Sequence, residues 1–290
     1  MQKNFVFIVL GVLIGLNVLA WIGVFQLSHA NLEVTFFDVG QGDAIFIETP
    51  EGHQILIDGG LSSVILEKLG NEMPFWDRTL DLIVLTHPDF DHIAGLIEVL
   101  KRYEVQNILW TGVLCETAEC QEWQKLIAAE GANIYLAQTG LRISGGRTSS
   151  GRYDLNILYP FESLEGREVS NTNNTSIVAR LVYGENSFLF TGDAYQSVER
   201  ELVKGGAEVD SDVLKVGHHG SKNSNSQEFI GAVSPSVAVI SAGKDNKYGH
   251  PHAETLAILE NYGTSILRTD LNGDIKILCN SQSLKLKSGD

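Results

Sequence analysis

The stretch LTHPDFDHIAGL, residues 85–96, packs four potential metal ligands into six positions: His87-x-Asp89-x-Asp91-His92. The preceding run LDLIVLT (80–86) predicts a buried strand, and the following IAGLIEVLKRY (93–103) has the apolar spacing of a helix. Asp89 and Asp91 also suit a turn or the N-cap of that helix. Two carboxylates beside two imidazoles are costly to bury without a cation, so we expect this loop to bind metal.

Short apolar runs separated by turn residues predict further elements on both sides of this loop. The expected strands are 32–39, 44–49, 54–58, 154–160, 175–183, 187–193, 211–217, 237–243, 265–269 and 274–279, and the other expected helices are 118–130, 194–204 and 253–263. Residues 141–152 are expected to form a loop or hairpin. The order of elements suits an α/β fold in which two sheets pack face to face with helices outside.

Residues 5–27, FVFIVLGVLIGLNVLAWIGVFQL, carry no charge. As a helix this run is about 35 Å long, enough to cross a bilayer. Lys3 precedes it and the next cation is Lys68, so we expect a cytoplasmic N-terminus and an external domain. We therefore divide the chain into an anchor or signal segment, 1–30, and a domain, 31–290. Cleavage after Ala30 would give a secreted protein, but the run exceeds the roughly 7–15 residues of a signal core, which favours an uncleaved anchor.

The 290 residues carry a formal net charge of −15, which makes general affinity for nucleic acid poor. Residues 215–252 differ locally, because four lysines stand against two acids, a net of +2. The lysines are Lys215, Lys222, Lys244 and Lys247. Cys115 and Cys120 are spaced for a small disulfide loop outside the membrane, although two unrelated thiols fit the same spacing.

Further polar motifs follow one another along the chain. They are FFDVGQGDA (36–44), LIDGG (56–60), the loop at 87–92, NNTS (173–176), LFTGDA (189–194), LKVGHHGS (214–221) and YGHPH (248–252). With these motifs in this order, the chain resembles a metallo-β-lactamase-fold hydrolase, and it is most similar to the metallo-β-lactamase-like domain of ComEC-type DNA-uptake proteins. Aspartate at the second ligand position, Asp89, is typical of the competence branch. The resemblance covers about residues 32–280 and implies a four-layer αββα sandwich with two metals at one edge.

The resemblance also implies a ligand set. His87 and Asp89 would hold the first metal, Asp91 and His92 the second, and Asp193 would bridge both. His218 is preferred over His219 for the second metal, with His219 facing substrate. The wider family has a further histidine near residues 150–176, which this chain lacks; Asn174 would contact metal or phosphate there, or cap a turn. This oxygen-rich first position favours Mn²⁺ as the activating ion of a two-cation centre, with Zn²⁺ able to bind.

The remaining predicted site residues fall into three groups. Those with catalytic roles are Asp91, His219 and His250; those that orient ligands are Asp38, Asp43 and Asp58; those that bind substrate are Asn174, Ser221, Lys222 and Lys247. Asp38 and Asp43 could instead only shape their turns, and Pro251 could simply fix the loop of His250. His250 would protonate the leaving oxygen or bind phosphate.

The expected function is that of a metal-dependent phosphodiesterase, a nuclease acting on single- or double-stranded DNA outside the membrane in uptake or degradation. With one predicted span, the chain is expected to work beside a DNA-uptake channel and not to be the channel. One alternative is a phosphodiesterase acting on choline or teichoic-acid linkages of the cell wall, and another is a DNA-binding subunit without turnover. A β-lactamase is disfavoured by Asp89 and the missing histidine.

Overall fold

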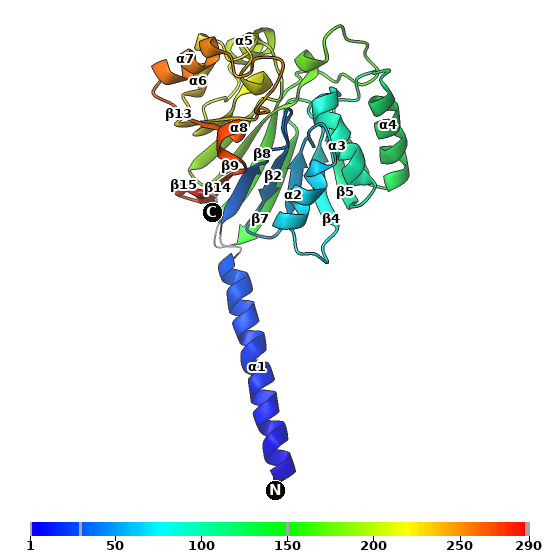
Figure 1. The fold of residues 1–290 in the computed structure, drawn as a ribbon, viewed down its shortest axis with the longest axis vertical. Coiled ribbons are helices and arrows are strands. Elements are labelled where there is room, and N and C mark those ends of the chain that lie inside the picture. The colour runs from blue at the N-terminus through cyan, green and yellow to red at the C-terminus, as the bar shows by residue number, and fades with distance from the viewer. Residues whose placement is uncertain (1, 29–30, 149–150, 288–290) are drawn as a thin grey trace.

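The computed structural model describes residues 2–28, 31–148 and 151–287, with side chains at 5–20, 31–146 and 151–287. In this part of the chain two sheets pack face to face (Figure 1). The strands of the first sheet are, in spatial order, β15 (Ser283–Lys287), β14 (Ile275–Asn280), β1 (Leu32–Phe36), β2 (Ile45–Glu48), β3 (Gln54–Ile57), β4 (Thr79–Val84), β5 (Glu104–Trp110) and β6 (Asn133–Leu136).

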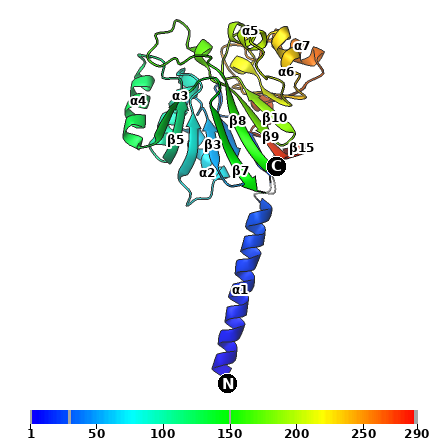
Figure 2. The same ribbon diagram turned by 180° about the vertical axis from the view of Figure 1, so that it is seen from behind.

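Figure 2 shows the molecule from behind, with several strands of the second sheet labelled. The strands of that sheet are, in spatial order, β13 (Ser265–Arg268), β12 (Val237–Ile240), β11 (Val213–Lys215), β10 (Asn186–Phe190), β9 (Val178–Tyr183), β8 (Gly151–Tyr159) and β7 (Arg142–Thr148). The segment expected to be a loop or hairpin is therefore the antiparallel β7–β8 pair.

Three apolar layers hold the sandwich together. The inner faces of the sheets form one, which includes Phe36, Leu181 and Phe190. The outer face of the first sheet packs under α2 (Val64–Glu72), α3 (Phe90–Leu100) and α4 (Ala118–Glu130). The outer face of the second packs under α5 (Gln196–Lys204), α6 (Gln227–Val233) and α7 (Ala253–Asn261), with the short α8 (Thr269–Asn272) beside β13. The expected αββα sandwich is confirmed.

Strand direction decides which loops share an edge. β3, β4 and β5 run parallel, as do β10, β11 and β12. Because β1 and β3 are both antiparallel to β2, β1 also runs parallel to β4. The loops that follow β1, β4, β10 and β11 carry most of the polar motifs, and they lie at the carboxyl ends of these strands.

α1 (Gln2–Ser28) extends away from the sandwich in both views (Figures 1 and 2). Along residues 5–20 its large apolar side chains are exposed. Within the part of the chain that the structure describes, no helix combines the length and the apolar character needed to cross a membrane. The membrane anchor at residues 5–27 stays a prediction.

Several elements differ from the sequence prediction. The helix expected at 93–103 begins at Phe90 and ends at Leu100, so its first turn already contains Asp91 and His92. α2, α6, β5, β6 and β15 were not expected. Cys115 and Cys120 form a disulfide, while Cys279 is a free, buried thiol.

Candidate metal centre

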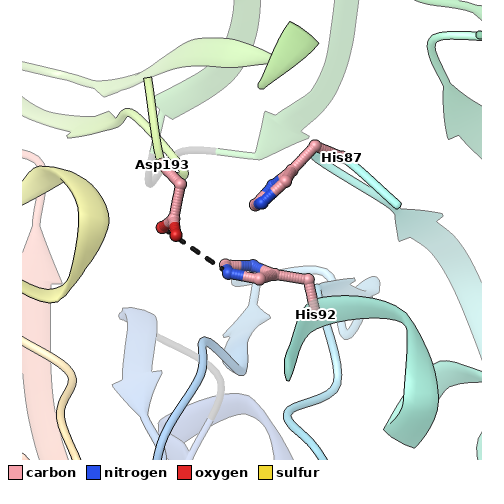
Figure 3. Close-up of side chains that lie close together, drawn as sticks. All are labelled: His87, His92 and Asp193. Atoms are coloured by element: carbon pink, nitrogen blue, oxygen red, sulfur yellow. Dashed lines mark ion pairs between the residues drawn. The ribbon is translucent and has the colours of Figure 1, made fainter. Parts of the chain in front are cut away.

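Three chain segments bring histidines and aspartates to one edge of the sandwich. His87 lies in the loop after β4 and His92 in the first turn of α3. Asp193 follows β10, and His218 and His219 lie in the short helix η2 (Gly217–Gly220) after β11. Figure 3 shows His87, His92 and Asp193 converging from these separate segments.

The inward atoms of this cluster are buried and have no hydrogen-bond partner among the described residues. They are the Nε2 atoms of His87, His92 and His219 and the Oδ1 atom of Asp193. Buried lone pairs are costly unless each meets a donor or a cation. The set therefore fits divalent metal ions, as nitrogen and carboxylate ligands do in proteins.

The opposite ring nitrogens are held by hydrogen bonds that fix the protonation of each ring. Nδ1 of His92 donates to Asp58 Oδ2 at 2.8 Å, and Nδ1 of His219 donates at 3.0 Å to the backbone carbonyl that follows β12. The Thr86 hydroxyl donates to Asp58 at 2.7 Å, so its oxygen accepts from Nδ1 of His87, 3.0 Å away. With Nδ1 held by these contacts, each ring directs Nε2 toward the cluster, the atom that would bind a metal ion.

Among the described residues, the possible metal ligands form four overlapping groups, two of which exclude Asp43 and Asp58. One contains His87, His92 and Asp193, whose ligand atoms all lie within 4.8 Å of one another; the other contains Asp91, His92 and His219. Asp193 faces both, with Oδ1 3.5 Å from His92 Nε2 and Oδ2 3.4 Å from His219 Nε2. Asp91 Oδ2 lies 3.3 Å from His219 Nε2. Asp193 therefore lies within reach of the residues of both groups.

The geometry favours His219 over His218 as the ligand from the double histidine, which reverses the preference drawn from the sequence. Both residues have positive φ angles, 50° for His218 and 53° for His219, so the chain turns sharply within η2. His219 enters the buried group, whereas His218 stacks on Tyr195 with 5.3 Å between ring centroids. His218 Nε2 lies 3.6 Å from Asp193 Oδ2, on the open side of the cluster.

Asp89 lies at the margin of the cluster. Its Oδ2 atom is 3.7 Å from His87 Nε2, and the Thr172 hydroxyl donates a hydrogen bond to its Oδ1 atom. Asp89 belongs to neither close group, but it is half-exposed beside the His87 side of the cluster. It is therefore placed to approach an ion from solvent.

The asparagine motif contributes a different residue from the one predicted. In η1 (Thr172–Thr175) the Asn173 amide lies 3.4 Å from His218 Nε2. The side chain of Asn174 turns the other way and accepts a hydrogen bond from Ser197 at 3.2 Å. The prediction that Asn174 contacts metal or phosphate is not supported, because its side chain is used to hold α5.

Two of the three predicted supporting aspartates contact the cluster. Besides Asp58, Asp43 places Oδ1 3.3 Å from His219 Nδ1 and Oδ2 2.8 Å from the Lys215 ammonium. Asp38 Oδ1 instead accepts a hydrogen bond from the Gly40 backbone N–H, a contact within its own turn. Lys215 is fully buried and paired with Asp43, so its contribution to the local net charge of +2 is not available to a substrate. Its position inside the apolar run DVLKVG was the signal that sequence reasoning missed.

The metal-free cluster is strongly coupled electrostatically. Burial opposes the charged form of His92, but Asp193 and Asp58 outweigh it and hold the pKa of His92 well above 6.5. His219 behaves alike, since Asp193 and Asp43 raise its pKa against the effect of burial. Burial would raise the pKa of Asp193, yet His219 and His92 hold it well below 3.8. Protons therefore occupy positions that cations would otherwise take.

The predicted substrate residues are only partly at this edge. Burial, followed by the neighbouring imidazoles of His219 and His218, lowers the pKa of His250 to about 4. The His250 ring lies 5.3 Å from that of His218. Lys222 and Lys247 are exposed, and the Lys222 backbone N–H donates to His252 Nδ1 at 3.3 Å. Ser221 is buried, and its backbone N–H bonds the His218 carbonyl at 2.8 Å, so its predicted contact with substrate is not supported.

Curated relatives of the chain are longer proteins. ComE operon protein 3 of Bacillus subtilis (strain 168) is 34% identical over 263 residues, which cover 84% of this chain and 32% of that protein. Competence protein ComA of Neisseria gonorrhoeae is 32% identical over 244 residues, with the same coverage of 84% and 32%. Recombination protein 2 of Haemophilus influenzae is 29% identical over 269 residues, 87% of this chain and 29% of that protein. The chain thus spans about a third of the length of these relatives, and the predicted resemblance to competence proteins is confirmed.

Solved structures and a family profile agree on the fold. The metallo-beta-lactamase fold protein YhfI of Bacillus subtilis superposes with a TM-score of 0.56 at 14% identity, over 88% of this chain and 100% of that one. Igni18, a metallo hydrolase of Ignicoccus hospitalis, gives 0.51 at 16% identity, over 85% and 98%. Residues 37–244 match the profile of the Metallo-beta-lactamase superfamily. The chain belongs to the metallo-beta-lactamase superfamily of metal-dependent hydrolases.

Proposed function

We propose that this chain is a metal-dependent phosphodiesterase that cleaves DNA. The observation that carries the proposal is the buried, unpartnered set of His87, His92 and His219 Nε2 atoms around Asp193. A subunit that only bound DNA would have no use for such a set. Relatives named Competence protein ComA and Recombination protein 2 make DNA the substrate that we favour.

The proposed centre holds two divalent cations, Mn²⁺ by preference, with Zn²⁺ able to bind. The proposed ligands are His87, Asp89, Asp91, His92, Asp193 and His219. Asp89 and the missing family histidine make one position rich in oxygen, which suits Mn²⁺ better than Zn²⁺. When bound, the two cations supply Lewis acidity, lowering the pKa of water and polarising a phosphoryl group.

The chain's own residues would hold and orient the diester on the open side of the cluster. His218 and Asn173 lie together beside Asp193, and His250 is uncharged at neutral pH because its pKa is about 4. Uncharged His250 suits a hydrogen bond to a phosphoryl oxygen better than proton donation to a leaving group. Asp91 and His219, predicted to be catalytic, take ligand roles in this proposal. The exposed Lys222 and Lys247 would meet neighbouring phosphates.

Two exposed rings near the cluster favour DNA over a teichoic-acid diester. Phe90, which stands between Asp89 and Asp91, is 55% exposed. Tyr248 is equally exposed and stacks on His250 with 5.7 Å between ring centroids. Exposed aromatic faces stack on nucleobases, with about 1–3 kcal/mol gained per base. Teichoic-acid linkages offer no planar group to stack, whereas a choline group could meet such rings only as a cation.

We also propose that residues 5–27 anchor the chain in a membrane, with the N-terminus in the cytoplasm and the metal centre outside. The support is the uncharged 23-residue run and its exposed apolar side chains over residues 5–20. Cleavage after Ala30 would release the domain instead. A DNA-uptake channel is the partner that we propose, because Competence protein ComA is among the relatives.

One set of assays separates the candidate functions. The full chain with Mn²⁺ is offered single- and double-stranded DNA, RNA and bis-p-nitrophenyl phosphate, beside Asp193→Ala and the exposed, remote control Asp210→Ala. We expect DNA cleavage by the parent and the control and none by Asp193→Ala. Cleavage of the small diester alone would support the cell-wall alternative, and DNA binding without cleavage would support a non-catalytic subunit.

A further inference from the structure

The turn between α2 and β4 presents two large aromatic rings to solvent. Phe75 is 80% and Trp76 is 71% exposed, more than any other large apolar side chain described outside α1. Their ring centroids lie 4.8 Å apart in an edge-to-face arrangement. Soluble proteins seldom leave adjacent rings of this size unburied, so the pair calls for a partner surface.

Hydrogen bonds hold the turn that carries these rings in place. Met73 is buried, and its backbone N–H bonds the Leu69 carbonyl at 2.8 Å. Asp77 closes the turn through a backbone hydrogen bond to Pro74, 2.9 Å long. The Asp77 carboxylate accepts from the Thr79 backbone and from the Gln54 side chain, both at 3.1 Å. The rings therefore stand away from the domain because the chain holds them there.

Strand direction places this turn at the end of the sandwich where the N-terminal helix joins. The turn precedes β4, α1 precedes β1, and β1 and β4 run in the same direction. The start of β1 and the start of β4 therefore share one end of the first sheet. In Figure 1 the turn between α2 and β4 lies at the same end of the domain as α1.

The metal cluster lies at the opposite end. His87 follows β4, whose six residues span about 20 Å as an extended strand. The exposed rings and the cluster thus lie at the two ends of the same strand. A surface in contact with the rings would leave the metal centre open.

We propose that Phe75 and Trp76 enter the headgroup region of the bilayer into which residues 5–27 insert, forming a second contact that sets the domain upright on the membrane. This inference rests on the proposed anchor. Tryptophan prefers the membrane interface, since its ring is apolar and its N–H remains wet. At the same end, a hollow is lined by three cations and two acids: Arg78, Lys101, Arg102, Glu104 and Glu130. Lys101 and Arg102 each pair with Glu98 at 2.8 Å, so the hollow is polar without an excess of positive charge. The metal centre faces away from the membrane.

The test reads the fluorescence of Trp76 in the full chain inserted in phosphatidylcholine vesicles. The chain has four tryptophans, so Trp21→Phe removes the one within the anchor. Trp123 is fully buried, and Trp110 packs against it with 6.4 Å between ring centroids. The difference between Trp21→Phe and the matched Trp21→Phe/Trp76→Phe protein isolates the emission of Trp76.

Vesicles with bromine atoms near the headgroups should remove most of that Trp76 emission, and aqueous iodide should lose its access to the ring. Flotation with the vesicles is measured on the same samples. A protein that floats while Trp76 remains open to iodide and unquenched by bromine would overturn the second contact and leave the anchor standing. A protein that does not float would overturn both, without bearing on the nuclease proposal.

Discussion

His218 and His219 occupy adjacent positions, but only His219 is buried and belongs to a group of possible ligands. Because His219 lies with Asp91 and Asp193, we expect His219→Ala to weaken one of two Mn²⁺ sites by more than about 100-fold, above the usual cost of losing a supporting residue. His218→Ala should keep both ions and lose turnover, since its ring faces the open side. Mn²⁺ titration and elemental analysis would distinguish them. Loss of an ion in His218→Ala alone would contradict the assignment.

The histidines also set an unusual pH dependence for the metal-free protein. His92 and His219 have folded-state pKa values well above 6.5, so their stabilising effect is complete below about pH 6.5 and is lost as pH rises through those values. The melting temperature with chelator should therefore fall as the pH rises above 6.5. With excess Mn²⁺ it should not fall, since deprotonated ligands bind the cation better. A metal-free melting temperature that rises over this range would contradict this account.

The sequence predicts some residues of the site correctly and others not. The ligand-rich loop at 87–92, Asp58 and Asp193 are where the motifs put them, because strand ends determine their position. The choices between His218 and His219 and between Asn173 and Asn174 depend on local turns. The burial of Lys215 depends on its ion pair with Asp43, which is distant in sequence.

At the scale of elements, α3 is positioned by a close glycine contact. An added Cβ on Gly95 would overlap the backbone of Gly59, the residue after Asp58. We expect Gly95→Ala to destabilise the fold by about 1–3 kcal/mol, as overpacking does, and to weaken Mn²⁺ binding because α3 carries His92. Urea unfolding and metal titration would measure both effects.

Gly70 in α2 is the matched control for that substitution. A Cβ there meets nothing within 4 Å, so Gly70→Ala should stabilise the protein by about 0.5–1 kcal/mol through helix propensity alone. Equal effects of the two substitutions would mean that the contact with Gly59 does not position α3.

The elements that the sequence did not predict are short or lie at an edge. β6 has mostly exposed residues, and β5 alternates buried and exposed positions without a long apolar run. α2 is only nine residues long, so its helical spacing extends over little more than two turns. These elements form because the sheet requires them: α2 covers its outer face, and β5 and β6 extend it beyond β4. The strands near the site could be predicted because each is almost wholly buried and therefore forms a clear apolar run.

At the scale of the whole molecule, the N-terminal and C-terminal parts of the sandwich domain pair with each other. Near the C-terminus, β14 pairs with β1, and Cys279 stands opposite Leu32 in the register. Both side chains are completely buried in the core between the sheets. This long-range pairing was not predictable from local patterns, and it makes opening of the first strand a global event.

Cys279 can therefore report on the unfolding of the entire domain. Burial raises its pKa to about 12, and the other two cysteines form a disulfide, so a thiol reagent at pH 8 should label the native protein only when it opens. A bound ion stabilises the folded state by about 2.7 kcal/mol at a hundred times its Kd, so Mn²⁺ should slow labelling roughly 100-fold per site. Asp193→Ala should lose most of this protection while Asp210→Ala keeps it. Fast labelling of the native protein, or equal rates with and without Mn²⁺, would show that metal binding at the edge is not coupled to the stability of the core.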